Sequence, residues 1–515
     1  MTSIPSSPPV ARPRTRRTSS AASWLRLRLL ALVILVVVVD VAFGRVSFGW
    51  PLSAVLAVVA TVSATLNPRR ARGRTLALSA AILVLGLVAP IVDANGLSVL
   101  LAVLATAAFS ILLVSGSPAG ALALVASSLR TWVSGPVRLL RDLVRVRRAG
   151  ARRASRSPVR LLSWLGAIAF AMPFLLLLSD GDPLIARGVG ALDPRHLLAM
   201  LSFGRVMWWA TVTVLVWPFV HVRLARPRDG ASWTARLGGG IAEVFFGDAV
   251  VVRALVLFNA LFAVQTALDL AFLWSGPRVP AGWTMAEFAH RGFYSQMAAA
   301  ALAGGFALVS MRAGGPAERS RLVRALLTSW TVQTLILVGS ATRRLALYVD
   351  GYFLTEARLA AFAWTALVAV GLVTILLLVA GRLRFARVVD VNVVAALAMA
   401  WTWAVVDTDA IVANYNVDGV LADPSSIARL DGYHLMRLEP GALPAIDRLL
   451  ERFPCRSGAK DMREWRARTI TALVEREVGV RDWSLNHWRV RRVAIDLMKY
   501  HGLPGHDDSH AVNCE

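Results

Sequence analysis

The sequence lacks the short motifs that mark the known soluble catalytic classes. It has no phosphate-binding glycine loop after a strand, no His-Glu-x-x-His and no nucleophile elbow. It is also poor in charge, because only 17% of its 515 residues are charged, against about 25% in an average soluble protein. With 56% hydrophobic residues and a mean hydropathy of +0.58, the composition excludes an ordinary soluble enzyme and indicates a membrane protein.

Long apolar runs dominate what is present. A hydrocarbon core about 30 Å thick needs about 20 helical residues, and lipid leaves no backbone group unpaired, so each run predicts a helix. We therefore expect an all-α polytopic bundle of about 11 transmembrane helices with a small C-terminal helical domain outside the membrane. The runs are residues 24–44, 50–66, 75–93, 97–115, 161–179, 203–222, 249–274, 292–311, 325–342, 357–380 and 388–412. Residues 118–133 are predicted to be an interfacial or re-entrant piece rather than a twelfth span.

Composition divides the chain into six segments. Ser, Pro, Thr and Arg dominate the first 23 residues, which predicts disorder there. The other segments are the first four spans in 24–135, an Arg-rich loop in 136–160, two spans with a loop in 161–244, spans seven to eleven in 245–413, and a helical domain in 414–515.

The net charge of +24 is distributed unevenly along the chain. If the N-terminus is cytoplasmic, the inward segments hold 31 basic and 3 acidic residues, whereas the outward segments hold 8 and 7. This asymmetry is the positive-inside pattern and predicts a bacterial inner membrane protein with its C-terminal domain in the periplasm.

The densest basic block is the predicted loop 136–160, with nine arginines and one acidic residue. It is interpreted as a stop-transfer segment beside anionic lipid headgroups. Nucleic-acid binding is not expected, because the block has no folded basic surface and no interleaved aromatic residues.

Both cysteines, Cys455 and Cys514, lie in the C-terminal domain. In an oxidising periplasm they are candidates for a disulfide, whereas an error of one in the span count would leave two cytoplasmic thiols. Periodic segments predict helices near Ala445–Arg452, Met462–Val478 and Leu485–Tyr500.

Polar groups inside spans are costly and are therefore the first candidates for a functional site. The candidates are Asn259, Gln265, Asp269 and Gln333. Gln265 and Asp269 lie four residues apart and share one helix face. Hydrogen bonding between helices is the simpler explanation for such residues.

A second set of candidates maps to the outer interface of spans seven to eleven. It comprises Glu287, His290, Arg291, Arg343, Arg344, Asp350, Glu356, Arg358, Asp407 and Asp409. They are interpreted either as a mixed-charge cluster or as ordinary anchors that fix helix ends. Glu287 and His290 have a metal-site spacing, but a second pair is missing, so neither a metal nor a cofactor is expected.

Four segments carry a resemblance to a known family. They are LFNALFAVQTALDLAFLWSG, PAGWTMAEFAHRGFY, YFLTEARLAAF and LDGYHLMRLEPGALPAIDRL, within about residues 245–450. In this order they resemble the bacterial multi-pass family called domain of unknown function 4173, with the related 4153 group as the alternative. The resemblance implies an integral membrane protein without an assigned reaction, and it leaves the first four spans as a variable extension.

Three functions follow as hypotheses. The first is a non-enzymatic envelope scaffold or sensor whose tail meets a protein partner in the periplasm. The second is a secondary transporter that uses the polar residues of spans seven to eleven. The third is a membrane enzyme that uses Glu287 and His290. No repeat relates the two halves of the chain, which favours the first over transport.

Overall fold

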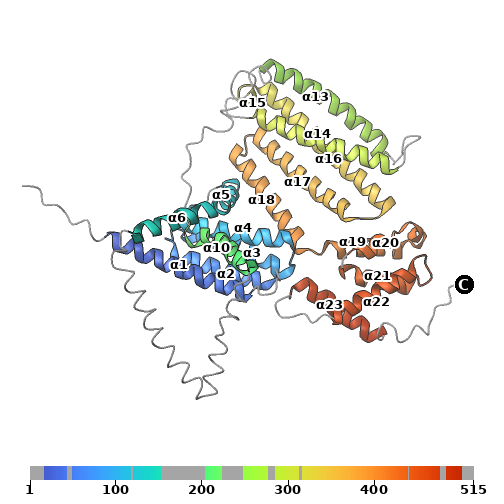
Figure 1. The fold of residues 1–515 in the computed structure, drawn as a ribbon. Coiled ribbons are helices and arrows are strands. Elements are labelled where there is room, and N and C mark those ends of the chain that lie inside the picture. Colours follow the sequence, from blue (N-terminus) through green and yellow to red (C-terminus); the bar gives the residue numbers. More distant parts are fainter. Residues whose placement is uncertain are drawn as a thin grey trace, which may run out of the picture.

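The computed structural model describes residues 17–42, 49–117, 120–151, 203–222, 248–275, 285–311, 316–438, 440–475 and 483–501, and every regular element in them is a helix (Figure 1). The predicted all-α class is confirmed. Seven helical stretches in the described residues are long and apolar enough to cross a membrane, which supports a polytopic membrane protein. They lie in α3 (Gly73–Val92), α4 (Gly96–Ser115), α13 (Asp248–Asp269) with the π-helical turn η2 (Leu270–Trp274), α14 (Met285–Ser310), α16 (Arg321–Tyr352), α17 (Glu356–Val379) and α18 (Phe385–Val405).

The predicted count of eleven spans is not confirmed. Helix α2 (Trp50–Leu66) has 17 residues and is about 25 Å long, which is shorter than the hydrocarbon core. The apolar part of α10 (Phe203–Val220) is likewise short, as is α5 (Ala121–Val133), where an interfacial piece was expected. The predicted span 24–44 falls mostly in α1 (Arg17–Ala42), and the predicted span 161–179 lies outside the described residues.

The eleventh predicted span, 388–412, is wrong at its C-terminal end. Helix α18 ends at Val405, the backbone of Val406 is extended, and α19 (Thr408–Ala422) begins after it. The side chain of Asp407 accepts a hydrogen bond from the Ala410 amide at 2.9 Å and so caps α19. The sequence is apolar on both sides of Asp407, so hydropathy predicts one continuous helix. An N-cap such as Asp407 is recognised by its hydrogen bond and not by its hydropathy.

Two segments predicted to be irregular are helical instead. Helix α1 begins at Arg17, within the predicted disordered N-terminus. Helix formation is cooperative, so the long apolar helix that follows extends backwards into these residues. Helix α6 (Gly135–Ala151) occupies much of the predicted Arg-rich loop. Its Leu139 and Asp142 are buried, and Asp142 lies 3.3 Å from both Trp217 Nε1 and His221 Nδ1. The partners that order this segment are remote in sequence.

The N-terminal helices form one packed group. Helices α1, α2 and α10 contact one another, and α2, α3, α5 and α18 pack against α4. Leu35, Val59 and Trp217 are buried together in its core. At the α3–α4 contact, a Cβ on Gly86 would clash with the Cβ of Ala105, so glycine is needed for this close approach.

A second group consists of α13, α14, α16 and α17, with the long α16 in contact with the other three. Helix α18 contacts α17 on one side and α3, α4 and α5 on the other, so it joins the two groups (Figure 1). Asp390 of α18 lies at the start of α5, where its Oδ1 accepts a hydrogen bond from the Leu122 amide at 3.4 Å.

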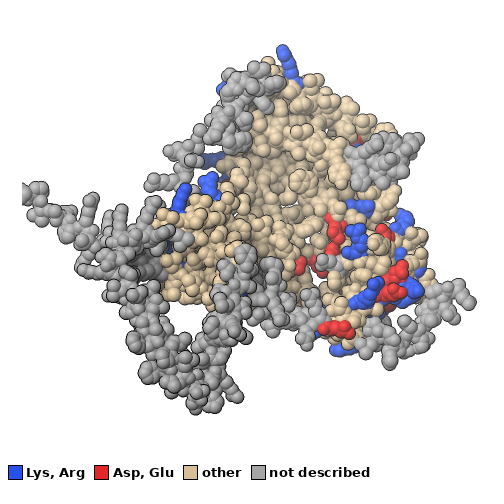
Figure 2. Space-filling model, in the orientation of Figure 1, with Lys and Arg blue, Asp and Glu red and all other residues tan. Residues whose placement is uncertain are grey.

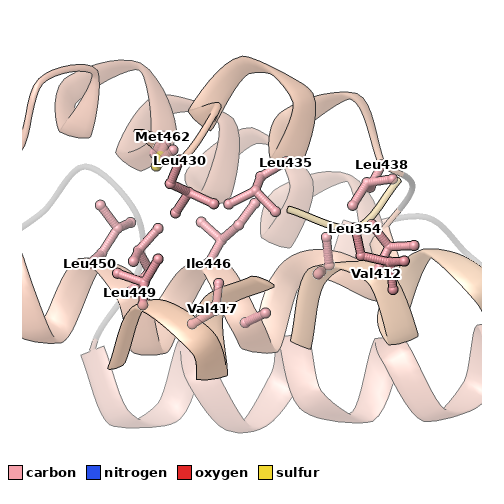
Figure 3. Close-up of a cluster of buried hydrophobic side chains, with 14 of the residues drawn as sticks. Leu354, Val412, Val417, Leu430, Leu435, Leu438, Ile446, Leu449, Leu450 and Met462 are labelled. Atoms are coloured by element: carbon pink, nitrogen blue, oxygen red, sulfur yellow. The ribbon is translucent and has the colours of Figure 1, made fainter. Parts of the chain in front are cut away.

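The C-terminal tail, residues 407–501, is a compact helical domain. It comprises α19, the short helices η3 (Pro424–Arg429), α20 (Gly432–Arg437) and η4 (Pro440–Ala442), and then α21 (Leu443–Arg452), α22 (Ala459–Glu475) and α23 (Leu485–His501). The last three match the predicted helices closely. Figure 3 shows Leu435, Ile446 and Leu449 in its core. Cys514 lies outside the described residues, so its bridge to Cys455 stays a prediction.

Candidate functional site

A buried polar network lies between α13, α14 and α16. The Asp269 side chain is 2% exposed and accepts hydrogen bonds from the guanidinium of Arg344, from Gln265 Nε2 at 2.9 Å and from Gln296 Nε2 at 3.3 Å. Arg344 is also buried, so the carboxylate and the guanidinium neutralise each other within the spans. Such pairing makes a charge tolerable in the bilayer.

The helix containing Asp269 changes its geometry directly after that residue. Leu270–Trp274 form the π-helical turn η2, a feature that is frequent at functional sites. Trp274 Nε1 donates to Ser340 Oγ at 3.3 Å, and Arg343 Nε donates to the Leu273 carbonyl at 3.3 Å. The Arg343 guanidinium also lies 5.0 Å from the centre of the Trp274 ring. Neighbouring residues of α16 thus hold both Asp269 and the π turn.

The other two predicted polar residues form a separate contact at the same interface. Gln333 Nε2 of α16 donates to Asn259 Oδ1 of α13 at 3.4 Å, and Asn259 Nδ2 donates to the Leu326 carbonyl at 3.1 Å. The structure therefore brings all four predicted residues to the α13–α16 interface, in two groups. The prediction did not include Gln296, although its amide within a predicted span was a signal of the same kind.

The predicted outer-face residues do not form one cluster. Arg343 and Arg344 point toward α13 and η2, whereas Asp350 and Glu356 are exposed. Arg358 donates to the carbonyls of Tyr352 and Phe353, close to its own helix start. The side chains of Glu287, His290 and Arg291 lie outside the described residues. Asp407 and Asp409 lie at the α18–α19 junction.

That junction borders a large open cleft of about 1070 Å³. One wall comes from the α3–α4 turn and the end of α18, and the opposite wall comes from α22 and α23. We call it the tail cleft. Its charged and aromatic lining residues are Asp93, Asp407, Asp409, Arg468, His487, Trp403 and Trp465. Apart from Asp407 and Asp409, sequence reasoning selected none of them, because they come from segments that only the fold brings together.

Hydrogen bonds fix the membrane-side wall of the tail cleft. Asn95 Nδ2 donates to Asp93 Oδ2 at 2.9 Å and to the Ala404 carbonyl at 3.0 Å, which ties the α3–α4 turn to the end of α18. The Asp407 carboxylate caps α19 and lies against Gly441, where a Cβ would clash with it. These carboxylates are held in position before any ligand binds.

The tail is also attached to the turn between α16 and α17. Leu354 of this turn is buried in the tail core together with Val349. The fully buried Asn416 accepts from the Leu354 amide at 2.7 Å and donates to the Leu354 carbonyl at 2.8 Å. Phe353, which precedes Leu354, has a φ of +64°, a backbone conformation that residues other than glycine rarely adopt. The tail is therefore joined firmly to α16, the helix that carries Arg344.

Among the described residues, acidic side chains are concentrated on the tail. Figure 2 shows acidic side chains over the tail and along its boundary with the spans, whereas the visible surface of the described spans is largely uncharged. Within the described residues, no group of three His, Cys, Asp or Glu side chains is arranged to hold a metal ion.

A family profile described as domain of unknown function (DUF4153) matches residues 79–449. The chain belongs to this family. The main predicted family, the 4173 group, is wrong, and the alternative 4153 group is the one found. The matched range starts within α3 and ends within α21, so the DUF4153 region includes α4 and the α18–α19 junction, rather than beginning near residue 245 as expected.

Neither the curated proteins nor the solved structures contain a match to this chain. The DUF4153 description assigns no activity, and a shared fold alone does not determine a function.

Proposed function

We propose that this DUF4153 protein is a membrane-embedded sensor that binds a ligand in the tail cleft. The observation that carries this proposal is the origin of the cleft walls, which come from the α3–α4 turn, the α18–α19 junction and the tail helices α22 and α23. A ligand in the cleft would contact spans and tail at once. Binding there would stabilise one arrangement of the two relative to any other.

The attachment of the tail supports a route for the signal. A shift of the tail would act on Leu354 through Asn416, and so on α16. Helix α16 carries Arg344 and Gln333, which contact α13. Packed side chains and hydrogen bonds of this kind transmit a displacement from one element to the next.

Location is the second part of the proposal. The basic excess of the inward segments supports a bacterial inner membrane with the N-terminus in the cytoplasm and the tail cleft in the periplasm. The arginines of 136–160 would then lie beside anionic lipid headgroups. The exposed side of the tail would be available to a periplasmic protein partner.

A thermal-shift panel tests the sensor proposal. Purified protein in micelles is heated with amines, amino acids, organic anions and sugars, and the same panel is applied to Thr469→Trp and Thr471→Trp. Thr469 lines the cleft, whereas Thr471 lies on the same helix and is not among the lining residues. At least one class should raise the Tm of the wild type and of Thr471→Trp but not of Thr469→Trp.

Hydrogen exchange tests the transmission of the signal. The ligand found in the panel should slow amide exchange at the α16–α17 turn as well as at the cleft. No shift with any class would contradict ligand binding, and protection confined to the cleft would contradict a sensor.

A second candidate function is transport, favoured by the π turn beside the buried Asp269. Gln296 Oε1 is buried there without a hydrogen-bond partner among the described residues, so the network has one acceptor to spare. Proteoliposome uptake of the cleft ligand, lost in an Asp269→Asn, Gln265→Ala double variant, would support transport. Equal and passive leakage in both proteins would contradict it.

A further inference from the structure

We infer that the ligand of the tail cleft is an organic cation, an amine or quaternary ammonium compound with an apolar body. This inference rests on the proposed function, because it names the chemistry of the molecule that the cleft would bind.

The charge of the lining favours a cation. The described lining residues include the carboxylates of Asp93, Asp407 and Asp409 and a single guanidinium, that of Arg468, with His487 as the other titratable group. The balance is therefore negative in a chain whose net charge is +24. Because the three carboxylates are only partly exposed, their charges are screened less than those of a free surface.

The carboxylates lie on one wall, where hydrogen bonds hold them. Asn95 donates to Asp93 and to the Ala404 carbonyl at the end of α18, which holds Asp93 in place. Asp407 is held by the hydrogen bond that it accepts from the Ala410 amide at the start of α19. A cation placed between them would meet two preformed acceptors that need little rearrangement. Such preorganisation lowers the entropic cost of binding.

Aromatic and aliphatic groups complete the lining. Trp403 of the last turn of α18 and Trp465 of α22 both line the cleft, as do Leu97, Leu473 and Val490. Tryptophan faces attract ammonium groups more strongly than other aromatic side chains do. The apolar residues favour an alkyl or aryl body over a bare metal ion.

The basic group of the cleft lies on the opposite, tail-side wall. Arg468 is exposed on α22, and its Nε donates to the Glu464 carbonyl of the same helix at 3.3 Å. This printed hydrogen bond of Arg468 is thus made within its own helix.

Isosteric probes test the inference, because they separate charge from shape. Choline and benzyltrimethylammonium are the cationic probes, neohexyl alcohol is the uncharged carbon isostere of choline, and tert-butylacetate is an anion of similar size. Binding to the full-length protein in micelles is measured by calorimetry and by Tm. We expect the cations to bind at least about tenfold more tightly than the neutral isostere, which is the effect of one desolvated charge contact.

Matched variants locate the charge effect. Asp93→Asn and Asp407→Asn retain a side-chain acceptor and remove only the charge, and each should weaken cation binding about fivefold, as partly exposed charges do. Asp496→Asn is the control, because Asp496 is exposed on α23 and is not among the lining residues. It should leave the affinity unchanged.

The possible results separate the inference from the proposed function. Equal binding of choline and neohexyl alcohol, or binding of tert-butylacetate that Thr469→Trp abolishes, would overturn the cation assignment and leave the cleft as a ligand site. Cation binding that Asp496→Asn weakens as much as Asp407→Asn would also overturn it. If none of these probes binds and the wider panel gives no shift, the proposed function fails as well.

Discussion

The network around Asp269 and the tail cleft both contain carboxylates, but their surroundings are opposite. In the network, one carboxylate is fully buried and receives hydrogen bonds from Arg344, Gln265 and Gln296. In the cleft, carboxylates are partly exposed around an open volume of about 1070 Å³. Such a closed, neutralised network stabilises the contact between helices, whereas partly exposed carboxylates that line an open volume can contact a ligand. Substitutions should therefore affect stability at the first site and binding at the second.

The largest expected effect comes from breaking the buried ion pair. Arg344→Met should cost about 3–5 kcal/mol of unfolding free energy, because it leaves the Asp269 charge buried without its partner. The measurement is denaturant unfolding in mixed micelles. The double variant Arg344→Met, Asp269→Leu should recover most of the loss, since neither charge remains. Arg343→Met serves as the neighbouring control, and an equal loss in that variant would contradict the special role of the pair.

The attachment of the tail should come next. Asn416→Ala removes both hydrogen bonds to the Leu354 backbone and leaves two buried polar groups unsatisfied, which should cost about 1–3 kcal/mol. Amide exchange at the α16–α17 turn should rise in parallel. Asn414→Ala is the control on the same helix, because Asn414 is partly exposed and bonds to Arg448. A tail that stays protected in Asn416→Ala would remove the proposed link between cleft and spans.

In the cleft, the wall residues should have a smaller effect on stability. Asp407→Ala removes the N-cap of α19 and should cost about 0.5–2 kcal/mol, whereas Asp407→Asn keeps a capping acceptor and should cost little. Unfolding midpoints of the two variants test this. If Asp407→Asn were as unstable as Asp407→Ala, the charge would serve the fold, and the contrast between the two sites would weaken.

Much of the fold could be predicted because bilayer crossing leaves a strong local signal. The long apolar runs that became α3, α4 and α17 were predicted within a few residues, as were the three tail helices, whereas α16 ends ten residues beyond the predicted end at 342. The errors arose where the local signal was ambiguous. Asp407 ends one helix and caps another inside an apolar stretch, and α6 is helical because Asp142 packs against α10, whose Trp217 is distant in the sequence.

The sites were predicted less completely, for a physical reason. Polar residues inside spans are rare, so Asn259, Gln265, Asp269 and Gln333 could be selected by type, and the fold gathers them at one interface. The residues of the tail cleft are ordinary in their local context. An aspartate after a span and a tryptophan on a tail helix can be recognised as parts of one site only when the fold shows that both line the same cleft.

The smallest expected effect concerns an exposed carboxylate, which tests whether exposure alone makes a charge unimportant. The hydroxyl and amide of Ser425 donate to Asp423 and hold the pKa of its carboxyl below the usual 3.8. Since the folded pKa is lower than the unfolded one, the ionised group contributes stability above about pH 4, and this contribution disappears as the pH falls through the folded pKa. Asp423→Asn should therefore unfold slightly more easily than the wild type at pH values of about 5 to 7, with the difference shrinking below about pH 4. Unfolding midpoints across this range, with Asp496→Asn as an exposed control, measure the effect. A difference that is constant with pH would show that the hydrogen bonds from Ser425 stabilise the tail without the charge of Asp423.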